Sequence, residues 1–194
     1  KNAASMILAD DNFSTIVKAI ITGRNVYRNI KNAIGFLLSG NTAAILAVLY
    51  SSLANLPVIF SAVQLLFINL LTDSLPSIAV GVEPKNEDIL DEKPRDPNEA
   101  ILTKRFSSKL LIEGVLIAAF IIRAFYIGLK DSPLKGSTMA FATLCLARLF
   151  HGIDYRGQRN IFAIGFFKNK FSLIAFAVGF ILLNAVLLCP PLYN

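Results

Sequence analysis

A single carboxylate stands inside a long apolar part of the sequence. Asp73 is the only charged residue between positions 32 and 82, within the run VQLLFINLLTDSLP at 63–76. Asn69, Thr72 and Asp73 occupy positions i, i+3 and i+4, which share one face of a helix. Together they offer an amide oxygen, a hydroxyl and a carboxylate to the same ligand.

Oxygen donors of this kind suit a hard cation such as Ca²⁺, Mg²⁺ or Na⁺. Pro76 adds to them, because it cannot donate a hydrogen bond to the carbonyl of Thr72 and therefore frees a backbone oxygen. No His or Cys stands beside these residues, which argues against Zn²⁺ or Cu⁺. The alternative is a structural cluster in which Asp73 is protonated or paired with a base on a neighbouring helix.

Asn41, in the run SGNTAA at 39–44, is a further candidate ligand, or else it makes a hydrogen bond between helices. A carboxylate at membrane depth costs at least about 2.5–3.5 kcal/mol on insertion scales, so such groups face a cavity or a partner. We therefore expect Asp73 to lie inside the protein and to serve as the centre of an intramembrane cation site.

The elements that position these groups are predicted to be membrane helices. The 194 residues are 55% hydrophobic and only 16% charged, whereas soluble domains average about 25% charged residues. Long uncharged apolar stretches are typical of membrane spans. We expect an all-α, polytopic transmembrane bundle with five spans, near 33–54, 58–82, 106–129, 137–153 and 171–189.

The segment before the first span is predicted to be helical as well. Apolar residues recur on one helix face from Ile16 to Ile34, and no proline interrupts the pattern before Pro57. Residues 13–32 therefore form a stalk that continues into the first span. The stretch 83–100, with three prolines and many charges, is predicted to be a solvated loop.

Basic residues indicate the orientation of the spans. Five Lys or Arg residues precede the first span, five lie in 83–105 and four in 151–170, against two in 129–137 and none in 51–57. Cytoplasmic segments carry this excess, so the N-terminus and the stalk are predicted to be cytoplasmic. The net charge of +6 is explained by these span ends and does not indicate nucleic acid.

Four stretches of the sequence resemble P-type cation-transporting ATPases, especially the calcium pumps of reticulum, plasma-membrane and bacterial type. They are MILADDNFSTIVKAI, GRNVYRNIKN, VQLLFINLLTDSLPSIAVGVEP and ILDEKPRDPNEAIL. The resemblance implies that 1–12 is the tail of the phosphorylation domain and that 33–194 holds the fifth to ninth membrane helices. ATP and Mg²⁺ would then act in cytoplasmic domains outside this chain, which holds no catalytic residue and is inactive alone.

The same resemblance implies roles for individual residues. Asn69 and Asp73 match sixth-helix ligands of the calcium site shared by these pumps, and Asn41 matches a fifth-helix ligand. Thr72 matches a hydroxyl ligand of the additional site in two-calcium pumps. Two acidic ligands of that additional site are absent, because Ala44 and Arg148 stand at the matching positions.

We therefore predict an ATP-driven pump that moves one Ca²⁺ per cycle. Arg148, which stays protonated under essentially all conditions, is a candidate counter-ion for Asp73 after calcium leaves. The alternative is that Arg148 extends to the membrane interface. A pump for Na⁺, Mn²⁺ or H⁺ and a non-enzymatic channel or carrier remain alternative functions. The expected partners are the lipid bilayer and the remaining domains and first four membrane helices of the same pump, in a bacterial plasma membrane.

Overall fold

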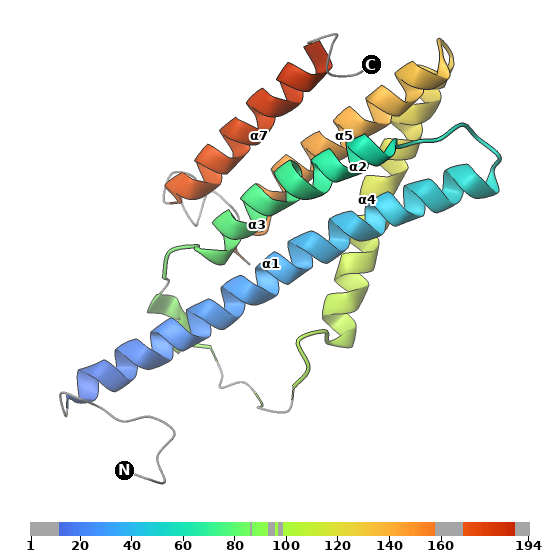
Figure 1. Ribbon diagram of the computed structural model, residues 1–194. Coiled ribbons are helices and arrows are strands. Elements are labelled where there is room, and N and C mark those ends of the chain that lie inside the picture. The colour runs from blue at the N-terminus through green and yellow to red at the C-terminus, as the bar shows by residue number, and fades with distance from the viewer. Residues whose placement is uncertain (1–11, 86, 93–95, 97–98, 158–168, 189–194) are drawn as a thin grey trace.

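The computed structural model describes residues 12–85, 87–92, 96, 99–157 and 169–188. Within these residues every regular element is helical, which confirms the all-α prediction. The predicted tail of the phosphorylation domain at 1–12 lies, except for Asn12, outside the described residues. So does most of the 151–170 segment. The long first helix is visible in Figure 1.

Helix α1 spans Phe13–Leu53 and contains 41 residues, which corresponds to about 60 Å at 1.5 Å per residue. Asn12 caps it by accepting a hydrogen bond from the backbone N–H of Ser14 at 2.9 Å. The predicted stalk and the first predicted span are thus one uninterrupted helix. Its N-terminal part extends beyond the ends of the other helices (Figure 1).

The second predicted span is a helix of three consecutive parts: α2 (Ala62–Phe67), the π-helical η1 (Ile68–Asp73) and α3 (Ser74–Gly81). We refer to all three as the Ala62–Gly81 helix. It begins four residues after the predicted start, because Ser61 and Gln64 form a capping box. A short 3₁₀ turn, η2 (Glu87–Leu90), follows it.

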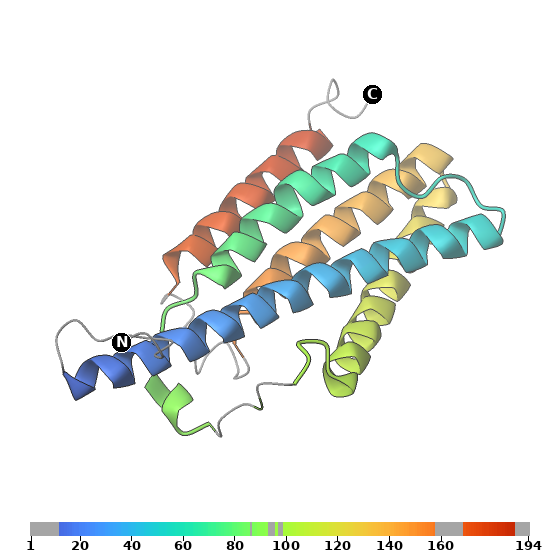
Figure 2. The ribbon, with the colours of Figure 1, turned by 60° about the horizontal axis from the view of Figure 1, so that its bottom comes forward.

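The last three described helices are α4 (Lys104–Leu129), α5 (Pro133–Asp154) and α7 (Lys170–Leu188). Helices α4 and α5 form a hairpin in which Gly128 meets the backbone of Gly136; a Cβ on Gly128 would stand 2.7 Å from the Cα of Gly136. Helix α7 contacts α5 and α3, and α4 contacts α1. Figure 2 shows α1, α5, the Ala62–Gly81 helix and α7 side by side, with α4 crossing at an angle.

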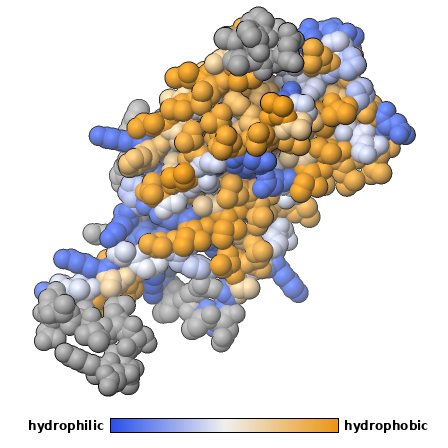
Figure 3. Space-filling view, in the orientation of Figure 1, coloured by the Kyte–Doolittle hydropathy of each residue, from blue (hydrophilic) through white to orange (hydrophobic). Residues whose placement is uncertain are grey.

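Four helices of the described part are long and apolar enough to cross a membrane: α1, the Ala62–Gly81 helix, α4 and α7. Helix α5, which matches the fourth predicted span, is not among them and carries Lys135, Arg148 and Asp154. On the face that Figure 3 shows, the surface of the bundle is largely apolar, while hydrophilic side chains gather towards the N-terminal part of α1 and at the opposite end of the molecule. Together with the helix lengths, this identifies an integral membrane protein.

Candidate intramembrane cation site

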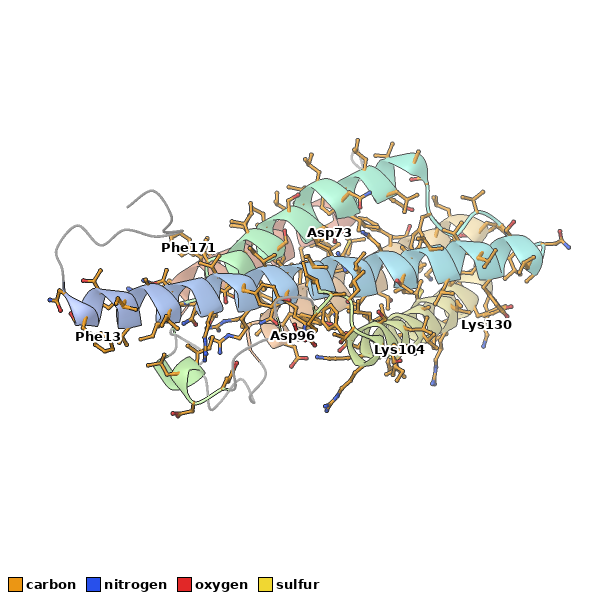
Figure 4. All side chains as sticks on the ribbon, turned by 90° about the horizontal axis from the view of Figure 1, so that it is seen from below. Phe13, Asp73, Asp96, Lys104, Lys130 and Phe171 are labelled. Carbon is orange, nitrogen blue, oxygen red and sulfur yellow. The ribbon has the colours of Figure 1, made fainter. Side chains whose placement is uncertain are left out.

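Asp73 and Arg148 form a buried ion pair at the centre of the bundle. Arg148 is 0% exposed and Asp73 is 4% exposed. The Nε of Arg148 donates a hydrogen bond to Oδ1 of Asp73 at 2.6 Å, and Nη2 lies 2.5 Å from the same oxygen without hydrogen-bond geometry. Arg148 therefore points into the bundle and does not extend to the membrane interface. Figure 4 shows Asp73 about midway along the helices, beside α1.

Helix α1 holds the other side of the guanidinium. The Nη1 of Arg148 donates to the backbone carbonyl of Phe36 at 2.7 Å, and the guanidinium carbon lies 4.3 Å from the centre of the Phe36 ring. A Cβ on Gly40 would overlap the guanidinium. Glycine at this position therefore creates the space that Arg148 occupies. As a result α1, the Ala62–Gly81 helix and α5 meet at the Arg148 guanidinium.

The helix that carries Asp73 is not a regular α-helix at this point. Residues Ile68–Asp73 form a π-helical turn, so the α-helical spacing that predicted one shared face for Asn69, Thr72 and Asp73 does not apply here. The hydroxyl of Thr72 donates to the carbonyl of Ile68 at 2.8 Å, and Ser74 donates its hydroxyl to the carbonyl of Asn69 at 3.0 Å. Single π-helical turns of this kind occur frequently at functional sites.

Pro76 is buried in the first turn of α3, three residues after the end of the π-helical turn. Because proline has no N–H and its ring crowds the carbonyl four residues before it, a regular α-helix is disfavoured at this place. Gly152 of α5 faces Pro76 closely, and a Cβ there would stand 2.7 Å from the Cβ of Pro76. Pro76 and Gly152 thus allow α5 to approach the Asp73 turn.

The predicted ligands fall into two groups. Thr72 and Asp73 are buried, whereas Asn41 and Asn69 are exposed on the described helices. No group of three or more His, Cys, Asp or Glu side chains suited to a metal occurs among the described residues. Of the predicted ligands, one carboxylate and one hydroxyl therefore lie inside the bundle, with the carboxylate held by Arg148.

A second polar cluster lies next to Arg148 on α5. The Nε2 of His151 is 2.9 Å from the hydroxyl of Ser39 and 3.6 Å from Oε2 of Glu113. Tyr155 donates its hydroxyl to the same oxygen of Glu113 at 2.5 Å. Sequence reasoning missed the parts played by Ser39 and Tyr155. The spacing of Arg148, His151 and Tyr155 at i, i+3 and i+7 was the signal that could have placed them on one face of α5.

Helices of membrane length around a buried carboxylate are typical of proteins that move ions across membranes. Residues 57–194 match the family described as "Cation transporting ATPase, C-terminus". The chain therefore belongs to this family of cation-transporting ATPases, and the resemblance seen in the sequence is confirmed.

Curated relatives match over nearly the whole chain. A calcium-transporting ATPase of Lactococcus lactis is 45% identical over 176 residues, which is 90% of this chain and 20% of the relative. A calcium-transporting ATPase of Listeria monocytogenes is 43% identical over 195 residues, covering 100% and 21%. The human "Calcium-transporting ATPase type 2C member 1" is 34% identical over 198 residues, covering 99% and 21%. The chain thus spans about a fifth of the length of these relatives.

Proposed function

We propose that this chain is the membrane part of an ATP-driven Ca²⁺ pump and that Asp73 is its central ion ligand. The observation that carries the proposal is the buried Asp73 on a π-helical turn of a membrane-length helix. The names of the relatives support calcium as the transported ion. ATP and Mg²⁺ act in parts of the pump outside this chain, to which we assign no catalytic residue.

The ligand set is Asp73 with Thr72, Asn69 and Asn41. The hydroxyl of Thr72 can donate to the Ile68 carbonyl while its oxygen accepts a cation. Exposed side chains of Asn41 and Asn69 leave their amide oxygens accessible. Because Ca²⁺ takes about 6–8 oxygen ligands, further ligands come from the remaining membrane helices of the same pump.

Arg148 acts as the counter-ion of Asp73 when calcium is absent. The guanidinium and a calcium ion compete for the same carboxylate oxygen, so calcium entry requires that Arg148 release Oδ1. The carbonyl and the ring of Phe36 hold the displaced guanidinium nearby. The guanidinium stays protonated after it is displaced, so a second calcium ion would be repelled by a positive charge at short range. This supports one Ca²⁺ per cycle.

The relatives in bacteria and the distribution of Lys and Arg support a location in a bacterial plasma membrane. The segments rich in basic residues, including the N-terminal part of α1, then lie in the cytoplasm. In this orientation the hairpin between α4 and α5 faces the outside. The family membership favours an ATP-driven pump over a channel or carrier.

The test uses the intact pump in membrane vesicles. Calcium is titrated while phosphoenzyme formation from ATP is measured for the wild type, Asp73→Asn and the control Asp131→Asn, which changes an exposed carboxylate at the hairpin. We expect half-maximal phosphorylation at about 10⁻⁷–10⁻⁵ M calcium, retained in the control and lost in Asp73→Asn. Phosphorylation that ignores calcium but responds to Na⁺, Mn²⁺ or H⁺ would identify a pump for another cation.

The counter-ion role has its own test. Arg148→Glu replaces the guanidinium with an acidic ligand, so we expect a changed number of calcium ions per ATP and a changed pH dependence of transport. An Arg148→Glu pump with the wild-type stoichiometry and pH profile would contradict the role of Arg148.

A further inference from the structure

A second buried ion pair joins the end of α3 to the end of α5. The guanidinium of Arg156 donates through Nε to Oε2 of Glu83 and through Nη2 to Oε1, both at 3.0 Å. Glu83 is 8% exposed and Arg156 is 2% exposed. Glu83 was predicted to lie in a solvated loop at 83–100, whereas in the structure its side chain is buried. Two parallel hydrogen bonds between a guanidinium and a carboxylate fix both the distance and the orientation of the groups.

Two asparagines extend this pair to two further helices. Asn169 donates through Nδ2 to Oε2 of Glu83 at 2.6 Å and to the carbonyl of Ala79 at 2.9 Å. Its Oδ1 accepts from the backbone N–H of Ser172 at 3.0 Å and so caps α7. Asn29 of α1 donates to the backbone carbonyl of Glu83 at 2.9 Å. We call Glu83, Arg156, Asn169 and Asn29 the Glu83 cluster.

The segment after α3 is also fastened along α1. Arg24 donates to the carbonyls of Ile89 and Glu92 at 2.9 and 2.8 Å. Lys85 donates to the hydroxyl of Thr22 at 2.8 Å. The N-terminal part of α1 is therefore hydrogen-bonded at several points to the segment that begins at Glu83. Phe36, which binds Arg148, follows Asn29 by seven residues on the same helix, or about 10 Å along its axis.

We propose that the Glu83 cluster is a positioning device that makes α1, α3, α5 and α7 move together, so that a displacement of α1 reaches the Asp73 turn. Breaking a buried ion pair leaves an uncompensated charge inside the protein, so the four helices resist sliding past one another at this cluster. Movement is then directed to the π-helical turn and the single-oxygen contact of Arg148. This inference rests on the proposed pump function and adds the residues that couple its parts.

The experiment measures calcium stimulation, which is the ratio of phosphoenzyme formed from ATP with and without calcium, in the intact pump. Calcium binding at equilibrium and the unfolding temperature are measured on the same samples. The variants are Glu83→Gln, Asn169→Asp, which keeps the oxygen that caps α7 but removes the donor to Glu83, and the pair Glu83→Gln with Arg156→Gln. The control is Glu92→Gln, an exposed carboxylate in the same segment that lies 4.0 Å from Arg28.

We expect Glu83→Gln to lower calcium stimulation about fivefold or more, the lower end of typical coupling between two sites, while calcium is still bound. Asn169→Asp changes stimulation in the same direction, and Glu92→Gln leaves it at the wild-type value. The double variant has the same calcium stimulation as Glu83→Gln alone, because Glu83 and Arg156 act as one unit.

Wild-type stimulation in both Glu83→Gln and Asn169→Asp would overturn the inference. So would a loss of stimulation that always accompanies loss of calcium binding and a lower unfolding temperature, since the cluster would then only maintain the fold. The wild-type arm tests the proposed function separately, because phosphorylation independent of calcium in the unaltered pump refutes that function and not the coupling between Glu83 and Arg156.

Discussion

The Asp73–Arg148 pair and the Glu83–Arg156 pair both connect the Ala62–Gly81 helix or its end to α5, and both are buried. They differ in how the carboxylate is used. Arg156 engages both oxygens of Glu83, and Asn169 adds a third donor. Arg148 engages only Oδ1 of Asp73 and directs its other hydrogen bond to a backbone carbonyl.

The difference shows how two ion pairs of the same chemistry can have different roles. The carboxylate of Glu83 is bound on both sides, so that a competing cation would have to replace three hydrogen bonds. A cation arriving at Asp73 has to displace a guanidinium that retains the Phe36 carbonyl and ring as alternative partners. The first arrangement suits a fixed joint, and the second suits an exchangeable site.

Removing the two guanidinium groups tests this comparison most strongly. We expect Arg148→Met and Arg156→Met each to lower the free energy of unfolding by about 3–5 kcal/mol, since each leaves a buried carboxylate without its partner. Calcium then reduces the deficit of Arg148→Met, because the ion neutralises Asp73, and leaves that of Arg156→Met unchanged. Unfolding of the purified protein in detergent, with and without calcium, measures both effects. If calcium changed the unfolding free energy of Arg148→Met and Arg156→Met equally, the two ion pairs would not differ in their access to calcium.

The space beside Arg148 gives a second test. Gly40→Ala places a Cβ against the guanidinium, so we expect a loss of about 1–3 kcal/mol in unfolding free energy from overpacking. Gly23→Ala, in the same helix, meets nothing within 4 Å and should gain about 0.5–1 kcal/mol from higher helix propensity. Denaturant unfolding of both variants measures the contrast. A stabilising Gly40→Ala would show that Arg148 does not need this space.

Asn169 allows the capping of α7 to be separated from the contact with Glu83. Asn169→Ala removes both and should cost about 0.5–2 kcal/mol of unfolding free energy. Asn169→Ser keeps a capping oxygen without the long donor, so the difference between the two variants reports the cap alone. Thermal unfolding provides the measurement. If Ser and Ala had the same effect, Asn169 would act only through the amide that donates to Glu83 and Ala79.

An exposed ion pair is expected to contribute the least to the unfolding free energy among the pairs compared. Lys135 and Asp131 pair at the hairpin between α4 and α5, with side chains 58% and 59% exposed. Because exposed pairs are worth at most about 1 kcal/mol, we expect Lys135→Gln to change the unfolding free energy by less than about 0.5 kcal/mol. The same unfolding measurement checks this, and a larger loss would mean that burial is not what distinguishes the inner pairs.

The sequence was sufficient to predict that Asp73 is buried inside the protein, because a single charged residue in a long apolar run is costly to expose to lipid. It also located most helices closely; the predicted span 106–129 corresponds to α4 at Lys104–Leu129. Long apolar stretches with few charges are typical of membrane helices, so the extent of α4 could be predicted from its sequence. The division of α1 into a stalk and a membrane part remains a prediction, since the helix itself has no break.

Except for the pairing of Arg148 with Asp73, which the family resemblance suggested, contacts between distant parts of the chain were beyond the sequence. Glu83 and Arg156 are 73 residues apart, and each borders a charged segment that resembles a solvated loop. The π-helical turn depends on Pro76 and on the close approach of α5, which no local pattern of Ile68–Asp73 indicates. The ligand roles of Asp73, Thr72, Asn69 and Asn41 remain predictions, and the side chains of Asn41 and Asn69 are exposed on the described helices.

The fit between Gly40 and Arg148 also restricts the order in which sequences can change. An arginine at position 148 is destabilising while position 40 carries a side chain, whereas a smaller residue at 148 tolerates glycine at 40 throughout. We therefore expect that glycine at position 40 was acquired before arginine at position 148. Among related pumps, an arginine at 148 should be accompanied by glycine at 40, while glycine at 40 should also occur without the arginine.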